Sequence, residues 1–190
     1  MAKAIFDDMM KQAEGKGELE EVKVSDLWKV ITWKTPSKKE KDNFWDYIPF
    51  VKISDLHWKI YITTYEEWFS EKWIEKVKWK IIPRNSLIVS CIWTVWLVAI
   101  NNQKIVTNQQ INSIVFENKD YLYWLYFYLK KSRKKLELLW WNGATMLNVN
   151  KEKFSSFKIK ILLQQTLQTF NNQAKPILDL ILNLQLQTKT

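Results

Sequence analysis

The C-terminal segment, residues 161–190, carries the feature that most restricts the fold: a regular seam of apolar side chains. The seam positions alternate spacings of four and three residues over three heptad repeats, at Leu163, Leu167, Phe170, Ala174, Ile177, Ile181 and Leu184. This period is typical of a helix that packs against another helix. A single helix of this length is only marginally stable in water. The sequence therefore predicts a long C-terminal helix whose seam docks on a partner helix, with packing on its own domain as the alternative.

Upstream of the seam, helical and extended patterns alternate. Residues 2–14 have apolar side chains on one face and are followed by Gly15–Gly17, which predicts a short helix and a linker. Short apolar runs between residues 19 and 100 indicate strands, and residues 118–139 again have helical periodicity. The predicted fold class is α/β, of the α+β kind: a mixed globular domain followed by a long coiled-coil helix. Pro176 should kink this helix or mark a joint.

Positive charge is concentrated in the middle of the chain. The sequence has 29 basic and 20 acidic residues and a formal net charge of +9. Residues 23–160 contain 24 of the basic and 13 of the acidic residues, whereas residues 1–22 are net acidic. A basic domain suits a polyanionic partner, because each neutralised phosphate releases counterions. A solvated basic surface that maintains solubility is the alternative.

Tryptophan is common at positions where a turn would favour glycine. The chain has 12 Trp and 3 Gly, whereas an average glycine content of roughly 7% would give about 13. Trp33, Trp45, Trp58 and Trp79 lie in loop-like stretches, and a tight hairpin at position 58 would need a positive φ. Some bacterial lineages read the UGA codon as glycine and others read it as tryptophan. We therefore hypothesise that many or all of these residues are glycine in the natural protein. The alternative is that the indole rings are stacking platforms for bases or sugars.

Residues that enzymes need for catalysis are scarce. His57 is the single histidine and Cys91 the single cysteine. Nucleophile–histidine arrangements, zinc-binding clusters and nucleotide-binding loops cannot be assembled from this sequence, even with glycine at every tryptophan. The longest apolar run, residues 87–100, is shorter than the roughly 20 residues of a membrane helix. We expect a cytoplasmic, non-catalytic binding protein without a metal ion, another cofactor or a membrane contact.

Five segments, in order, resemble the DNA specificity (S) subunits of type I restriction–modification systems. The departures from the family pattern are nearly all tryptophans at glycine positions, as at Trp33, Trp93 and Trp96. The segments are residues 30–37 (VITWKTPS), 47–55 (YIPFVKISD), 81–96 (IIPRNSLIVSCIWTVW), 107–112 (TNQQIN) and 142–151 (NGATMLNVNK).

The resemblance implies one target-recognition domain and part of a spacer helix. Residues 1–18 would be the end of a preceding spacer helix and a linker, residues 19–160 the target-recognition domain, and residues 161–190 a truncated spacer helix. Family subunits carry two such units, and their spacer helices form an antiparallel coiled coil. The seam would then meet a second spacer helix of the same subunit or of a dimer mate. The chain would be the second half of a subunit, or a half-subunit that works as a dimer.

Further partners follow from the same resemblance: double-stranded DNA, a methyltransferase (modification) subunit and a restriction/motor subunit. Basic side chains would contact phosphates, and polar side chains on loops would address base edges. The candidate phosphate contacts are Lys34, Lys38, Lys39, Lys52 and Arg84. The candidate base readers are Thr35, Ser37, Asn142, Thr145 and Asn148. Backbone capping is a competing role for Asn148 and Asn150, and internal hydrogen bonds are expected for Asn108 and Gln109.

Two other functions compete with this one. The first alternative is a Trp-rich binding module. It would bind carbohydrate with little dependence on salt, or nucleic acid with a preference for single strands. The second alternative is a detached recognition domain of a fused methyltransferase–nuclease. The neighbouring reading frames distinguish this alternative from a type I specificity subunit, because separate methyltransferase and motor genes favour a type I system.

Mass spectrometry of the natural protein tests the glycine hypothesis. Glycine is the expected residue at position 58, because a tight turn there needs a backbone conformation that strains tryptophan. A peptide from the source organism with tryptophan at position 58 would contradict the hypothesis.

Overall fold

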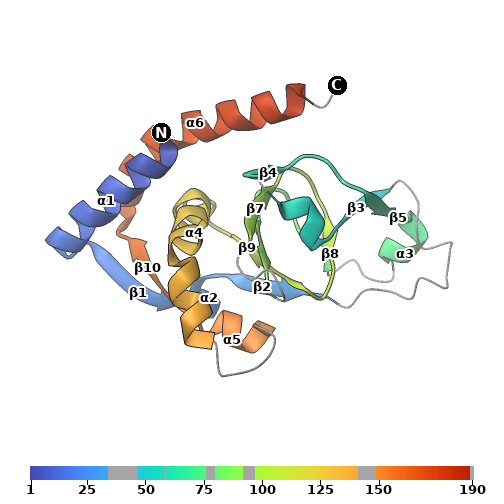
Figure 1. Cartoon of the computed structure of the whole chain (residues 1–190), viewed down its shortest axis with the longest axis horizontal. Coiled ribbons are helices and arrows are strands. Elements are labelled where there is room, and N and C mark those ends of the chain that lie inside the picture. Colours follow the sequence, from blue (N-terminus) through green and yellow to red (C-terminus); the bar gives the residue numbers. More distant parts are fainter. Residues whose placement is uncertain (34–46, 58, 76–79, 92–96, 141–148, 189–190) are drawn as a thin grey trace.

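The computed structural model describes residues 1–33, 47–57, 59–75, 80–91, 97–140 and 149–188, with the backbone alone for residues 135–140 (Figure 1). The helices are α1 (Ala2–Lys16), α2 (Val24–Leu27), the 3-10 helix η2 (Ile53–Leu56), α3 (Glu71–Glu75), α4 (Tyr121–Trp140), α5 (Lys151–Ser155) and α6 (Gln164–Gln187). The strands are β1 (Leu19–Lys23), β2 (Lys29–Thr32), β3 (Ile48–Val51), β4 (Tyr61–Ile62), β5 (Glu67–Phe69), β6 (Leu87–Ser90), β7 (Val98–Asn101), β8 (Val106–Thr107), β9 (Ile111–Val115) and β10 (Lys158–Leu162). The predicted α/β (α+β) class is confirmed.

A five-stranded sheet forms the centre of the fold. Its strand order is β2-β9-β6-β7-β4, in which β4 runs parallel to β7 and the other neighbours are antiparallel. Successive side chains of a strand point to opposite faces. Leu87 and Val89 accordingly enter one core, and Ile88 enters the other. Both faces of β6 are therefore buried, which explains why this strand reads as an uninterrupted apolar run rather than an alternating one.

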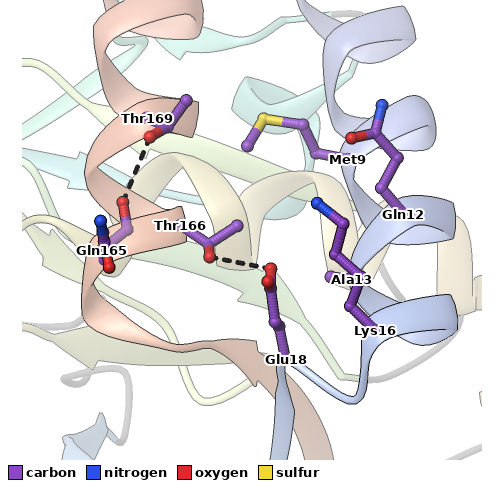
Figure 2. A pocket seen from close by; sticks show the side chains of 8 residues that line it. All are labelled: Met9, Gln12, Ala13, Lys16, Glu18, Gln165, Thr166 and Thr169. Carbon is purple, nitrogen blue, oxygen red and sulfur yellow. Dashed lines mark hydrogen bonds between the residues drawn. The ribbon is translucent and has the colours of Figure 1, made fainter.

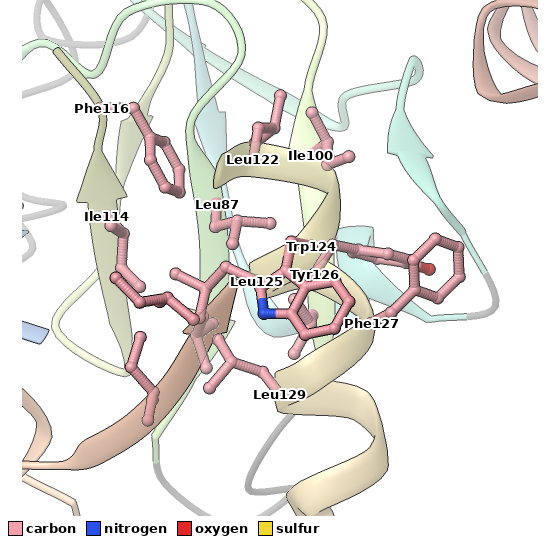
Figure 3. Close-up of a cluster of buried hydrophobic side chains, with 14 of the residues drawn as sticks. Leu87, Ile100, Ile114, Phe116, Leu122, Trp124, Leu125, Tyr126, Phe127 and Leu129 are labelled. Carbon is pink, nitrogen blue, oxygen red and sulfur yellow. The ribbon is translucent and has the colours of Figure 1, made fainter. Parts of the chain in front are cut away.

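Helix α4 covers one face of this sheet with a row of large side chains (Figure 3). Trp124 is fully buried, and its indole N–H donates to the backbone carbonyl of Lys160 at 3.0 Å. Its ring centre lies 4.7 Å from that of Phe6 on α1 and 5.3 Å from that of Phe170 on α6. Three helices that are distant in sequence therefore meet at one aromatic cluster, which we call the Trp124 cluster.

The opposite face of the sheet packs on the segment that contains β3 and η2. Val51, Leu56 and Ile62 are buried there together with Ile88. A smaller sheet, of order β5-β3-β8, continues from this layer and buries Phe50 and its neighbours in a third cluster. The domain thus consists of α4, the five-stranded sheet and a thinner β layer in succession (Figure 1).

The N-terminal helix shares the main core instead of standing apart from it. Gly17 ends α1 in a left-handed conformation with φ 69°, which suits a residue without a side chain. The chain then enters β1, which pairs with β10 from Leu19↔Leu162 to Lys23↔Lys158. Because Glu18 lies next to Leu163 and Phe6 lies next to Phe170, α1 and α6 are antiparallel.

The predicted seam of α6 divides into a covered half and an exposed half. Leu167, Phe170 and Ala174 are fully buried against α1 and α4 of the same chain, which corresponds to the alternative of packing within the chain. The helix α1 belongs to residues 1–18, the predicted end of a preceding spacer helix. Ile177 and Ile181 are partly buried, whereas Leu163 and Leu184 are about half exposed. The buried stripe continues instead through Leu178 and Leu182. A straight helix has 3.6 residues per turn, so its buried face drifts away from a strict heptad.

Helix α6 continues through Pro176 to Gln187, so the predicted joint is not a break in the helix. Pro176 is exposed. Its missing N–H removes one backbone hydrogen bond of the helix on the solvent side.

Several tryptophans have structural roles that glycine could not fill. Trp28 and Trp73 are buried, and Trp73 stacks on Trp33 with 4.6 Å between ring centres. Trp124 is the centre of the main aromatic cluster. The burial of Trp28, Trp73 and Trp124 favours tryptophan at these three positions, and glycine in the natural protein at the tryptophan positions stays a prediction. The positions 45, 58, 79, 93, 96 and 141 lie outside the described residues.

Replacement of Trp124 by alanine should destabilise the protein by about 3–5 kcal/mol, the cost expected when a buried aromatic side chain is removed. The same change at exposed Gln173 should alter stability by less than about 0.5 kcal/mol. Urea unfolding followed by circular dichroism measures both variants. Equal stabilities of the two variants would contradict the central position assigned to Trp124.

Candidate nucleic-acid interface

Two of the candidate DNA contacts, Lys52 and Arg84, lie within the described part of the chain. The others fall outside it: Lys34, Thr35, Ser37, Lys38, Lys39, Asn142, Thr145 and Asn148. The sequence assignments for those residues stay predictions. The structure does describe the residues that directly precede or follow several of these segments.

Lys52 is held between two carboxylates. Its Nζ lies 3.0 Å from Glu66 Oε2 and 3.0 Å from Glu67 Oε1. Desolvation opposes the charged form, but the hydrogen bonds to Glu67 and Glu66 outweigh it and raise the pKa of Lys52. A DNA phosphate would have to displace these carboxylates. The geometry thus favours a structural role, in which Lys52 links the start of η2 to β5, over the predicted phosphate contact.

Arg84, by contrast, is exposed on a turn that a buried asparagine holds in place. Asn101 is fully buried, its Oδ1 accepts from the backbone N–H of Ser86 at 2.7 Å, and its Nδ2 donates to the carbonyl of Pro83 at 2.7 Å. Asn85 has a positive φ of 60°, a conformation that asparagine tolerates better than most residues. Arg84 is therefore presented to solvent by a rigid turn, as a phosphate contact requires.

A second buried asparagine joins two segments of interest. Asn112 Nδ2 donates to the carbonyl of Val149 at 3.2 Å and lies 2.9 Å from Cys91 Sγ, and the Val149 N–H donates to the carbonyl of Cys91 at 2.9 Å. Burial raises the pKa of Cys91 to about 12, so the sulfur stays a neutral thiol. Residue 91 precedes the segment 92–96, and Val149 follows the segment that contains the candidate base readers.

The competing roles of three polar residues can now be assigned in part. Asn108 is buried, and its side chain exchanges hydrogen bonds with the backbone and side chain of Gln110, as expected. Asn150 caps α5 by accepting from the backbone N–H of Lys153 at 2.9 Å, which confirms its capping role. Gln109 is exposed. Asn101 and Asn112 were missed as functional candidates, although an asparagine within a buried apolar strand was a signal that could have identified them.

Hydrogen bonds from β4 and α4, which include a chain of hydroxyl groups, hold the C-terminal half of α6 in place. Tyr61 on β4 bonds Tyr123 on α4 at 3.2 Å, and the Tyr123 hydroxyl donates to Asp179 Oδ1 on α6 at 3.4 Å. Gln185 Oε1 accepts from the backbone N–H of Tyr61 at 3.3 Å. Burial raises the pKa of both tyrosines, so the hydroxyls keep their protons. These contacts fix the direction of α6 relative to the sheet.

At its other end, α6 is fixed to α1. A pocket of about 310 Å³ lies between the two helices, and Thr166 Oγ1 donates across its edge to Glu18 Oε2 at 3.0 Å (Figure 2). Met9 and Ala13 of α1 form the opposite wall. The long helix therefore has two separate anchor points on the rest of the chain.

The described residues offer little catalytic chemistry. No group of His, Cys, Asp and Glu side chains among them is arranged to hold a metal ion. His57 is exposed at the end of η2. Within the same residues, no helix combines the length and apolar character required to cross a bilayer. Trp28, Trp73 and Trp124 are buried, so these rings are not available as stacking platforms.

Comparison with known proteins identifies similar sequences and folds. Residues 16–169 match the model of the type I restriction modification DNA specificity domain. The chain is 34% identical over 168 residues to the type I restriction enzyme HindI specificity subunit of Haemophilus influenzae, covering 87% of this chain and 37% of that subunit. The chain thus spans little more than a third of the length of that relative.

Solved structures show the same fold at low sequence identity. The HsdS subunit from Thermoanaerobacter tengcongensis superposes with a TM-score of 0.64 and 12% identity over 97% of this chain and 46% of that one. The S subunit of a type I system from M. genitalium gives a TM-score of 0.56 and 10% identity, over 83% of this chain and 37% of the other.

Replacement of Asn101 by alanine tests the turn that carries Arg84. The change leaves the Ser86 N–H without its partner, whereas the Pro83 carbonyl keeps the hydrogen bond from the Ser86 hydroxyl at 2.8 Å. An unsatisfied buried group costs about 1–3 kcal/mol. The free energy of unfolding should therefore fall by about 1–3 kcal/mol, measured by urea titration. Asn172→Ala, at an exposed position of α6, is the matched control and should change it by less than about 0.5 kcal/mol. A similar loss in both variants would show that Asn101 does not hold the turn.

Proposed function

The chain belongs to the family of type I restriction modification DNA specificity domains, and on this premise we propose that it recognises a double-stranded DNA sequence without catalysing a reaction. The observation that carries the proposal is the family match across most of the chain. The excess of basic residues in the middle of the sequence supports it, because phosphate contacts supply a large part of protein–DNA affinity.

In the proposed mechanism, rigid elements present the DNA contacts. Arg84 contacts a phosphate from the turn that Asn101 holds, and this contact sets the register of the domain on the duplex. The segments that contain Thr35, Ser37, Asn142, Thr145 and Asn148 read base edges in a groove. The Asn112 contacts support this assignment, because they tie residue 149 to residue 91 and so limit where the adjoining segment can lie.

Helix α6 acts as a spacer in this proposal, and residues 1–18 and 161–190 flank a target-recognition domain of residues 19–160. The exposed side chains of Leu180 and Leu184 lie four residues apart on one side of α6. Residues with that spacing share a helix face, and exposed leucines gain free energy when another helix covers them. The covering helix is a second spacer helix, from a longer subunit or from a second copy of this chain.

The chemistry would be supplied by other subunits. A methyltransferase subunit modifies the recognised DNA, and a restriction/motor subunit cleaves it. Because the hydroxyl chain of Tyr61, Tyr123 and Asp179 fixes α6 against the domain, the position of the helix determines where the domain meets DNA relative to these partners. A detached recognition domain of a fused methyltransferase–nuclease would use the same surface. The genes beside this one distinguish the two arrangements.

Selection of DNA by the assembled complex tests the proposal. The chain, combined with the methyltransferase subunit from the same genome, is incubated with random-sequence duplexes at physiological ionic strength, and the bound fraction is sequenced. One enriched sequence is expected, bound about 10³-fold or more tightly than unrelated DNA. An unchanged base composition after repeated selection would refute sequence recognition.

Two variants distinguish the proposed phosphate contact of Arg84 from the proposed helix contact of Leu180 and Leu184. Arg84→Gln should weaken binding of all sequences similarly, because a phosphate contact carries no base information. Leu180→Gln with Leu184→Gln should weaken assembly with the second helix, measured by light scattering, while the bases selected by one domain stay the same. Loss of base preference in the leucine variant, with the assembly intact, would contradict the division between reading domain and spacer.

A further inference from the structure

A pocket lined by basic and aliphatic side chains lies between α4 and the β4–β7 edge of the five-stranded sheet. The pocket has a volume of about 310 Å³. Three cationic side chains, Lys59, Lys130 and Arg133, line it together with Leu56, Ile60 and Leu97, and no carboxylate is among its described lining residues.

Two of the three cations have only uncharged partners within the described part of the chain. Lys59 Nζ donates to Thr64 Oγ1 at 2.6 Å. Lys130 Nζ donates to the hydroxyl of Tyr126 at 3.1 Å and lies 5.2 Å from the centre of that ring. A hydroxyl group and an aromatic ring do not neutralise a positive charge.

Some lysines elsewhere on the surface are paired with acidic side chains: Lys52, Lys131 and Lys158 each lie 2.9–3.1 Å from a carboxylate oxygen. Lys59 and Lys130 contact hydroxyl groups and an aromatic ring instead. Burial also lowers the pKa of Lys130, because its ammonium group has lost water without gaining a counter-charge. An anion in the pocket would supply this counter-charge.

The composition of the lining restricts the anion further. The remaining lining residues, Leu56, Ile60, Leu97 and Val98, are aliphatic, and an inorganic ion would leave them uncovered. A ligand with a singly charged oxyanion next to a small carbon framework covers both surfaces. The nucleic acid backbone has this composition, because each phosphodiester is joined to a sugar whose carbons are apolar.

The helix that supplies Lys130 and Arg133 also precedes one of the segments proposed to read bases. α4 ends at Trp140, and the sequence continues directly into the segment that contains Asn142, Thr145 and Asn148.

We propose that the pocket of Lys59, Lys130 and Arg133 binds one phosphodiester of duplex DNA, with the adjoining deoxyribose against Leu56, Ile60 and Leu97. This inference rests on the proposed function and adds a backbone contact that the sequence motifs do not include. Because phosphates carry no base information, the pocket contributes affinity and register and leaves the choice of bases to the loops.

Salt-dependent binding tests the pocket. The full chain is titrated with a fluorescent random-sequence duplex at several NaCl concentrations, and the variant K59Q/K130Q/R133Q is compared with K11Q/K23Q/K104Q, which removes the same charge at exposed positions outside the pocket. Each lost phosphate contact lowers the slope of log affinity against log salt by about 0.9. We expect the pocket variant to lose about 0.9 in slope, as for one phosphate, and at least about tenfold in affinity at 0.1 M NaCl, and the control to lose less than about half a unit of slope.

A second measurement does not depend on variants. Acetic anhydride labels accessible lysines, and mass spectrometry compares the labelling of the intact chain with and without duplex. Lys59 and Lys130 should become protected by DNA, whereas Lys11, Lys23 and Lys104 should react equally in both samples. Thermal unfolding of the variants verifies that they are folded.

Each outcome decides one of the two proposals. Equal slopes for the pocket variant and the control, with equal labelling of Lys59 and Lys130, would overturn the pocket assignment and leave sequence recognition standing. A pocket variant that loses affinity for a single-stranded oligonucleotide or RNA, and not for duplex, would also overturn it. If the unmodified chain in its methyltransferase complex selects no sequence, the proposed function fails, whatever the pocket does.

Discussion

The contact of α1, α4 and α6 around Trp124 is the interaction on which the rest of the structure depends. Phe6 and Phe170 approach the indole ring from the two terminal helices, and the indole N–H reaches the carbonyl of Lys160 on β10. Burial of large aromatic side chains is a strong source of stability. Here it also joins both ends of the chain to the helix that covers the main sheet. The packing of the core therefore fixes the direction of α6.

A few buried polar groups fix the positions of turns, strands and helix α6 relative to one another. Asn101 fixes the turn of Arg84, Asn112 joins residues 91 and 149, and the hydroxyl groups of Tyr61 and Tyr123 connect the sheet to Asp179. Polar groups in a dry interior must be paired with specific partners. They therefore specify distances and directions more sharply than apolar contacts do.

The lysines fall into two groups, those that a carboxylate neutralises and those without a carboxylate partner in the described residues. Lys52 resembles a DNA contact in sequence, yet Glu66 and Glu67 neutralise it. Lys130 lies in a helical stretch whose basic residues have an ordinary structural role at the end of the helix dipole. The fold brings it beside Lys59, which is distant in sequence, and gives neither a carboxylate partner in the described residues. Net charge predicts that a polyanion binds, and only the tertiary arrangement indicates which cations are left for it.

The sequence by itself determined the mixed α/β class, the two terminal helices, the long helix α4, the run of β6 and the family, because these depend on local periodicity and on ordered motifs. It could not determine that Leu167, Phe170 and Ala174 face their own domain, since a heptad pattern records apolar spacing and not the identity of the covering surface. Nor could it separate Trp124, which the core requires, from tryptophans in loop-like stretches, because burial is decided by residues far away in the chain. Tertiary structure alone decided which cations are neutralised and which asparagines hold the turns. These roles depend on distances between segments that meet only when the chain folds.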